Sequence, residues 1–234
     1  IQLAKLLEHT WPDMSGKRVL ELGTGTGIVG LVAGARWLLR FVEFVCSPME
    51  LFVEIAAFLG ADAVLTDLPD VMGFVQQNLD ANAKLLKGRG TAQTLVWGET
   101  DLSAFMRDRP PFDLVVGSDL VYERELAQLL LDTLVGVTGR ETLVIYATDR
   151  RGRDGFLLFL GEVAKHFDVN EVADDEQHPS FLFQHIRMIK LRKKAAPTAA
   201  AAEAAAASTD SVTTATASAA ASANVAAADS KVGS

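Results

Sequence analysis

Residues 17–27 read KRVLELGTGTG, in which a short run with the composition of a strand leads into three alternating glycines. The apolar run before Gly23 is typical of a buried strand, and the residues from Ile28 onward have a helical pattern. A strand that ends in Gly-x-Gly-x-Gly brings backbone N–H groups close to a ligand, because only glycine permits so close an approach. The N-terminus of the following helix adds a partial positive charge. The stretch therefore predicts a ligand-binding turn after the first strand of an α/β sheet.

Short apolar runs with the composition of β-strands alternate with longer helical patterns along the chain. That alternation is typical of a parallel sheet with crossover helices. We predict a Rossmann-like, doubly wound α/β fold with a seven-stranded sheet, mostly parallel with an antiparallel last strand, and helices on both faces. The predicted strands are 17–22, 63–66, 91–96, 112–117, 142–147, 167–172 and 181–191, and the predicted helices are 3–7, 28 onward, 71–79, 126–134 and 156–166.

The composition of the chain changes near Ala195. Residues 195–234 are almost entirely Ala, Ser and Thr. They lack the large apolar side chains whose burial offsets the entropy cost of ordering a chain. We therefore predict one folded domain over residues 1–194 and a disordered tail over residues 195–234.

Residues 35–56 do not fit the alternation of strands and helices. The stretch is strongly apolar but is interrupted by charged residues and Pro48, so it has no uncharged run near the ~20 residues that a membrane span needs. Its apolar positions could form an amphipathic helix on a membrane or on the domain. Alternatively, the segment is foreign to the fold, as a retained intron would be, because without it the first crossover helix has an ordinary length. We favour this second interpretation, an anomalous apolar insertion in the first crossover.

Charge and cysteine content narrow the classes of partner and site. The net charge is −8, and lysine and arginine do not gather into a long patch, so nucleic acid is not the partner that we expect. The single cysteine, Cys46, excludes an internal disulfide and suits a reducing compartment, which predicts a location in the cytoplasm, or in cytoplasm and nucleus. The four histidines are scattered without metal-ligand spacing, so we expect no metal site. We also expect a monomer.

Two cofactor classes fit the glycine turn on its own. Gly25-x-Gly27-x-x-Gly30 also satisfies the dinucleotide fingerprint, so an NAD(P) oxidoreductase is an alternative. Glu21 counts against it, because a carboxylate two residues before the first glycine would repel a pyrophosphate but would suit an ammonium group. Asp67 closes the second predicted strand, where a carboxylate can hydrogen-bond ribose hydroxyls.

Four stretches lie at the ends of the first four predicted strands, namely Glu21–Gly30, Leu65–Pro69, Leu95–Gly98 and Phe112–Tyr122. Together they resemble the seven-β-strand (class I) S-adenosylmethionine-dependent protein-lysine methyltransferases. The run from Asp119 to Tyr122 is similar to the Asp-x-x-Tyr motif of one branch, the methyltransferase-like 21 type of the family 16 methyltransferases. The resemblance covers nearly all of residues 1–194 apart from the insertion, and it implies a class I methyltransferase domain there.

The resemblance implies a role for each candidate site residue. S-adenosyl-L-methionine would be the cofactor, with its methionine and ribose portions along the glycine turn. Asp67 would bond its ribose hydroxyls, Trp97 would border its adenine, and Ser118 would contact it at the end of the fourth strand. Asp119 and Tyr122 would lie where a substrate lysine enters, and they are the candidate catalytic residues. The candidate cofactor-binding residues are Glu21, Gly23, Thr24, Gly25, Gly27, Asp67, Trp97 and Ser118.

Four of these residues also have plainer interpretations. Trp97 could be a core residue at a strand end, and Ser118 could be a small residue that permits close packing. Asp119 could be the N-cap of a helix that begins near Glu123, since aspartate is common at that position. Tyr122 could be an ordinary packing residue.

The predicted function is transfer of a methyl group to a lysine ε-amine of a substrate protein. No Ser/His or Cys/His pairing in the sequence suggests covalent catalysis instead. One alternative is a class I methyltransferase that acts on a small molecule or another side chain, because this fold hosts many acceptors. A catalytically impaired binding module is another, because the first crossover is interrupted. An NAD(P) oxidoreductase is the least favoured.

Overall fold

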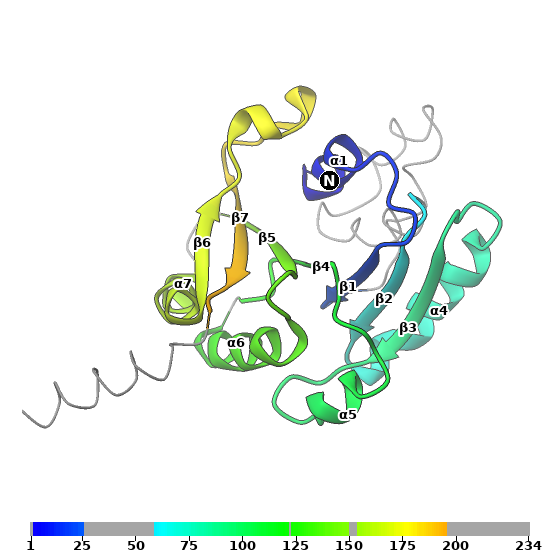
Figure 1. The fold of residues 1–234 in the computed structure, drawn as a ribbon, viewed down its shortest axis with the longest axis horizontal. Coiled ribbons are helices and arrows are strands. Elements are labelled where there is room, and N and C mark those ends of the chain that lie inside the picture. Colours follow the sequence, from blue (N-terminus) through cyan, green and yellow to red (C-terminus); the bar gives the residue numbers. More distant parts are fainter. Residues whose placement is uncertain (1, 26–58, 122, 150–153, 196–234) are drawn as a thin grey trace, which may run out of the picture. The chain divides into compact units, whose positions relative to one another are not determined.

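The computed structural model describes residues 2–25, 59–121, 123–149 and 154–195 (Figure 1). The chain divides into two units, Ile1–Lys194 and Ala195–Ser234. The predicted insertion at 35–56, and the predicted tail apart from Ala195, lie outside the described residues and stay predictions. The α-helices are α1 (Gln2–Thr10), α4 (Pro69–Asn82), α5 (Leu102–Met106), α6 (Arg124–Val137) and α7 (Asp154–His166). The strands are β1 (Arg18–Leu22), β2 (Asp62–Asp67), β3 (Arg89–Thr94), β4 (Leu114–Ser118), β5 (Leu143–Asp149), β6 (Phe167–Glu171) and β7 (Ile186–Lys193).

The strands form one sheet in the order β3-β2-β1-β4-β5-β7-β6. The first five in sequence pair in parallel, whereas β7 runs antiparallel to both β5 and β6. The predicted doubly wound sheet with an antiparallel last strand is thus confirmed. Strands β2 and β3, which follow β1 in the sequence, lie on one side of β1 in the sheet. The chain then crosses back, and β4 lies on the other side of β1. Ligands of such sheets bind at the carboxyl ends of the strands where the order reverses, which here are β1 and β4.

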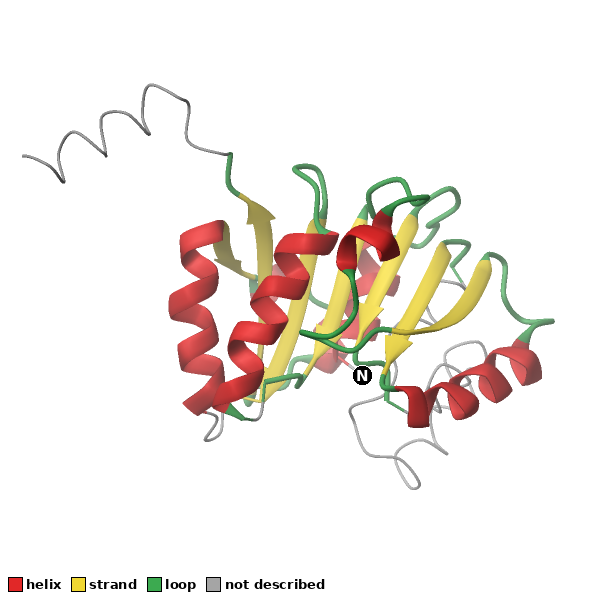
Figure 2. Ribbon diagram, turned by 90° about the horizontal axis from the view of Figure 1, so that it is seen from below, coloured by secondary structure: helices red, strands yellow, loops and turns green. Residues whose placement is uncertain are grey.

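Alternate residues of the central strands belong to two different cores. Val19 packs in one core with Leu3 of α1 and Val75 of α4. Leu20, the next residue along β1, packs in the other with Leu130 of α6. Successive side chains of a strand point to opposite faces, so neighbouring residues of β1 are buried on the two opposite faces of the sheet. Helices therefore cover both faces of the sheet, as Figure 2 shows.

The short helix α5 is a local feature that the sequence patterns did not predict. Its N-cap Asp101 accepts hydrogen bonds from the backbone N–H groups of Ser103 (2.9 Å) and Ala104 (3.1 Å). Such a cap satisfies N–H groups that lack a partner within the helix. The helix has only five residues, which is too short for a repeating apolar pattern to reveal it.

The last strand begins later than the sequence predicted. We expected it from residue 181, but a 3₁₀ turn (η3) occupies Pro179–Phe181 and β7 starts at Ile186. Proline fixes its own φ angle near the helical value, and the His178 imidazole accepts a hydrogen bond from the backbone N–H of Ser180 (3.2 Å), which closes this turn. The apolar residues after the turn therefore belong to a loop between β6 and β7.

Candidate active site

The glycine turn leaves β1 with two residues in left-handed backbone conformation. Gly23 and Gly25 both have φ of +63°. A Cβ atom on Gly23 would lie 2.4 Å from Cδ2 of Leu120, so a larger residue would have a costly backbone conformation and would displace that side chain. Between the glycines, the Thr24 N–H donates to the carbonyl of Thr66 at 3.0 Å, which ties the turn to β2.

Asp67 is held at the end of β2 by two backbone N–H groups. Its Oδ2 accepts from Gly25 and its Oδ1 accepts from Leu68, both at 2.7 Å. Hydrogen bonds from backbone groups to a carboxylate are charge-assisted and orient it firmly. The carboxylate therefore links the glycine turn to the end of the second strand, and its half-buried side chain borders a pocket.

That pocket has a volume of about 380 Å³ and lies at the carboxyl ends of β1, β2 and β4. It brings together six of the residues that the sequence singled out: Gly23, Gly25, Asp67, Trp97, Ser118 and Asp119. Trp97 also packs against the second core, so its plainer interpretation and its place at the site are compatible. Further lining residues, which sequence reasoning missed because they look like ordinary core positions, are Leu68, Leu95, Val96, Leu120, Leu126 and Leu129.

Four candidate residues are placed elsewhere or not described. Glu21 and Thr24 are buried side by side, with the Thr24 hydroxyl donating to the Glu21 carboxylate, and neither lines the pocket. Their roles toward a ligand stay predictions. Gly27 and Tyr122 lie outside the described residues, so the proposed contribution of each also stays a prediction.

Asp119 follows β4 in left-handed conformation, with φ of +53°. Its Oδ1 accepts hydrogen bonds from the Thr148 hydroxyl and from the Asp149 N–H, each at 3.0 Å. Its own N–H donates to the carbonyl of Ala147 at 2.9 Å. The carboxylate is thus fixed to the end of β5. It does not cap α6, whose N-cap is Glu123, so the helix-cap interpretation is wrong.

Tyr146 lies beneath the loop that carries Asp119. Its hydroxyl oxygen accepts the N–H groups of Leu120 (3.0 Å) and Val121 (3.2 Å). Burial raises the pKa of the Tyr146 phenol to about 12, the nearby Asp119 charge acts in the same direction, and the backbone donors oppose both. The hydroxyl therefore stays protonated throughout the neutral range. Sequence reasoning missed this residue because a tyrosine inside an apolar strand looks like core.

The raised pKa of Tyr146 predicts a loss of stability in alkali. An ordinary tyrosine has a pKa of about 10, so the folded state binds this proton more tightly than the unfolded state. The resulting stabilisation is complete below pH about 10 and is lost as the pH rises through about 12, which corresponds to about 3 kcal/mol. Urea unfolding at several alkaline pH values should show a smaller loss for Tyr146→Phe than for the parent chain. The sequence has two tyrosines, so tyrosinate absorbance of that variant reports Tyr122 alone. Equal losses in both proteins would contradict the prediction.

Other kinds of site were sought among the described residues. No group of three or more His, Cys, Asp or Glu side chains there could hold a metal ion. None of the helices in this part of the chain is long and apolar enough to cross a membrane.

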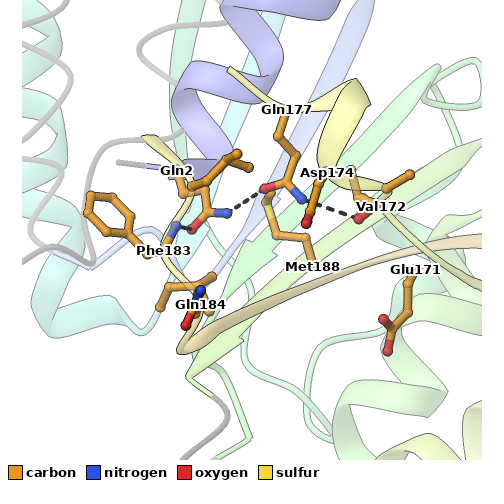
Figure 3. Close-up of a pocket in the computed structure, with 11 residues that line it drawn as sticks. Gln2, Glu171, Val172, Asp174, Gln177, Phe183, Gln184 and Met188 are labelled. Carbon is orange, nitrogen blue, oxygen red and sulfur yellow. Dashed lines mark hydrogen bonds between the residues drawn. The ribbon is translucent and has the colours of Figure 1, made fainter. Parts of the chain in front are cut away.

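A second pocket of about 620 Å³ lies between the start of α1 and the loop that joins β6 to β7 (Figure 3). Its two buried glutamines satisfy each other and the backbone, because Gln2 bonds Gln177, Gln177 donates to the Val172 carbonyl, and Gln2 accepts from the Phe183 N–H. These glutamines fix the loop to α1, so the polar side chains at this pocket have a structural role.

Comparisons with known proteins show which families of sequence this chain resembles. A family model described as lysine methyltransferase matches residues 3–166. Protein N-lysine methyltransferase METTL21A of Danio rerio is 30% identical over 196 residues, which cover 80% of this chain and 74% of the relative. EEF1A lysine methyltransferase 3 of Mus musculus is 31% identical over 177 residues, which cover 75% of this chain and 64% of the relative.

Among solved structures, the METTL16 MTase domain matches with a TM-score of 0.50 and 11% identity, and the match covers 82% of this chain and 66% of that one. At that identity the likeness shows the fold alone. The chain spans less than two thirds of the length of several curated relatives that it matches.

Proposed function

The chain belongs to the lysine methyltransferase family, and on that premise we propose that it transfers a methyl group from S-adenosyl-L-methionine to the ε-amine of a lysine in a substrate protein. The observation that carries the proposal is the pocket at the reversal point of the sheet. There the glycine turn and Asp67 lie on one side and Ser118 and Asp119 on the other. The same pocket thus has groups that can bind a nucleoside and a carboxylate that can contact an acceptor amine.

The residues present fit the cofactor. The volume of about 380 Å³ falls within the roughly 300–1,000 Å³ of small-molecule sites. Gly23 and Gly25 line the pocket without a side chain, so a ligand can approach their backbone closely. Asp67 is already oriented by Gly25 and Leu68, and each of its oxygens has lone-pair capacity for a further donor such as a ribose hydroxyl. Trp97 offers a flat apolar surface beside them.

The chemistry needs positioning more than new bonds to the protein. When bound, S-adenosyl-L-methionine supplies the activated methyl group and a positive sulfonium charge. A lysine amine attacks only as the neutral base, and its ordinary pKa is about 10.4. Asp119 can orient the amine and accept its proton, directly or through water. Apolar neighbours such as Leu126 and Leu129 exclude water from the same pocket.

The test is methyl transfer together with cofactor binding. Purified chain should transfer radiolabelled methyl groups to lysate proteins and to EEF1A, after which the Mus musculus relative is named, and mass spectrometry should find the label on lysine ε-nitrogens. S-adenosylhomocysteine should raise the melting temperature, whereas NAD should not. Asp67→Ala should weaken S-adenosylhomocysteine binding about 10- to 100-fold, because charge-assisted hydrogen bonds are lost.

The matched control is Asp62→Ala, at the opposite end of β2 and exposed. It should leave binding unchanged. A folded chain that binds S-adenosylhomocysteine but methylates no protein would overturn the lysine assignment, and so would label on a small molecule or on another side chain. A shift with NAD alone would overturn the cofactor assignment as well.

A further inference from the structure

Two buried hydroxyl groups lie beside Asp119 on the neighbouring strand. Tyr146 and Thr148 are two residues apart on β5, so their side chains point to the same face of the sheet. Their exposed fractions are only 2% and 1%. β4 and β5 pair so that Ser118 lies opposite Ala147, the residue between them. Both hydroxyls are therefore next to the point where the chain turns out of β4 and into the loop of Asp119.

Each of the two hydroxyl groups has a hydrogen bond to the loop of Asp119. The Tyr146 oxygen accepts from the N–H groups of Leu120 and Val121. The Thr148 hydroxyl lies 3.0 Å from Oδ1 of Asp119. An ionised carboxylate can only accept, so Thr148 donates to Asp119. Tyr146 therefore bonds the backbone of the loop, and Thr148 bonds the carboxylate.

We propose that Thr148 and Tyr146 are positioning residues for methyl transfer, which hold Asp119 at the pocket through these hydrogen bonds. The proposal rests on the proposed function of Asp119. Hydrogen bonds in the low-dielectric interior are stronger than those in water. The Tyr146 phenol holds the loop at Leu120 and Val121, while the Thr148 hydroxyl holds the Asp119 carboxylate. These two residues of β5 thus position both the backbone and the side chain of Asp119.

The backbone conformation of Asp119 supports a functional role for these hydrogen bonds. A left-handed φ is costly for any residue except glycine, although aspartate and asparagine adopt it more readily than others. Strained positions persist where the surroundings impose them, and they gather at functional sites. Here the surroundings are the Tyr146 hydroxyl, the Ala147 carbonyl and the Thr148 hydroxyl. The residue held in this conformation lines the pocket.

The experiment compares two replacements of Thr148. Thr148→Val keeps the shape and removes the hydroxyl, so kcat should fall about 10- to 100-fold, as expected when a charge-assisted hydrogen bond is lost. KM for S-adenosyl-L-methionine should change less than about twofold, because Thr148 is not a residue that lines the pocket. Thr148→Ser retains the hydroxyl and should restore kcat to within about threefold of the parent chain.

Thr142→Val is the matched control. Thr142 is equally buried, precedes the same strand and donates its hydroxyl proton to the Phe112 carbonyl at 2.7 Å, far from Asp119 along the strand. It should cost as much stability as Thr148→Val in urea unfolding and leave kcat unchanged. Tyr146→Phe is a second probe, and its kcat should fall as well.

Three outcomes would overturn the positioning role while the parent chain is active. They are a normal kcat for Thr148→Val, an equal loss of kcat in Thr142→Val, and a failure of serine to restore kcat. If the parent chain itself methylates no protein, the proposed function fails and the positioning role falls with it. The activity of the parent chain therefore tells the two failures apart.

Discussion

Asp119→Asn should lower kcat for methyl transfer by at least about 100-fold, the range found when a positioned proton acceptor is removed. Asparagine tolerates left-handed backbone, so it suits the φ of +53° at this position. Its amide oxygen can still accept from Thr148 and Asp149. The substitution therefore removes the charge with little change of shape. Single-turnover methyl transfer and calorimetric titration with S-adenosylhomocysteine would measure the effect, and the affinity should change less than about threefold because the charge acts on the acceptor.

Asp132→Asn on α6 is a control for the loss of one carboxylate, because Asp132 is exposed and accepts a hydrogen bond from Gln128 on its own helix. It should have the parent rate. Asp119→Ala also removes the acceptor for Thr148 and Asp149, so it should lose stability as well as activity. A normal kcat for Asp119→Asn would show that the substrate lysine enters elsewhere, even if the cofactor binds as proposed.

The sheet was predictable because its signals are local and periodic. A short apolar run is typical of a strand that is buried on both faces, and four of the seven runs here are followed by a helical pattern. The site residues at the strand ends were predictable for a related reason. The carboxyl ends of parallel strands meet at one edge, so Gly23, Asp67 and Ser118 come together once the strands are placed.

The residues that hold this edge in place could not be predicted in the same way. Tyr146 and Thr148 matter through the β4–β5 pairing that places them beside Asp119, and pairing is a long-range property. Leu120 looks like any core leucine, yet it fills the space that Gly23 and Gly117 leave open. Local sequence thus indicates which residues meet in a pocket at the strand ends, whereas the partners of Asp119 depend on register and packing.

Gly23→Ala is expected to have the second large effect, on cofactor binding and on stability together. The φ of +63° costs an ordinary residue about 1–2 kcal/mol. The new methyl group would also lie 2.4 Å from Cδ2 of Leu120. Overpacking of this kind costs about 1–3 kcal/mol. Leu120 would have to shift to make room, and its other branch, Cδ1, already fills the space beside Gly117. The free energy of unfolding should fall by about 3 kcal/mol, the sum of the two costs.

Any shift of Leu120 would also move the loop of Asp119, its neighbour in the chain, so the damage would spread from one side of the pocket to the other. Affinity for S-adenosylhomocysteine should drop at least about 100-fold, because the glycine turn and Leu120 both line the pocket and both would be displaced. Gly73→Ala is the matched control. It lies inside α4 with open space around the added methyl group, and alanine favours a helix over glycine by about 1 kcal/mol. That variant should bind normally and unfold at slightly higher urea concentration. If Gly23→Ala behaved like Gly73→Ala in both measurements, the glycine turn would not be the cofactor cradle, and the ligand would have to approach the sheet from another edge.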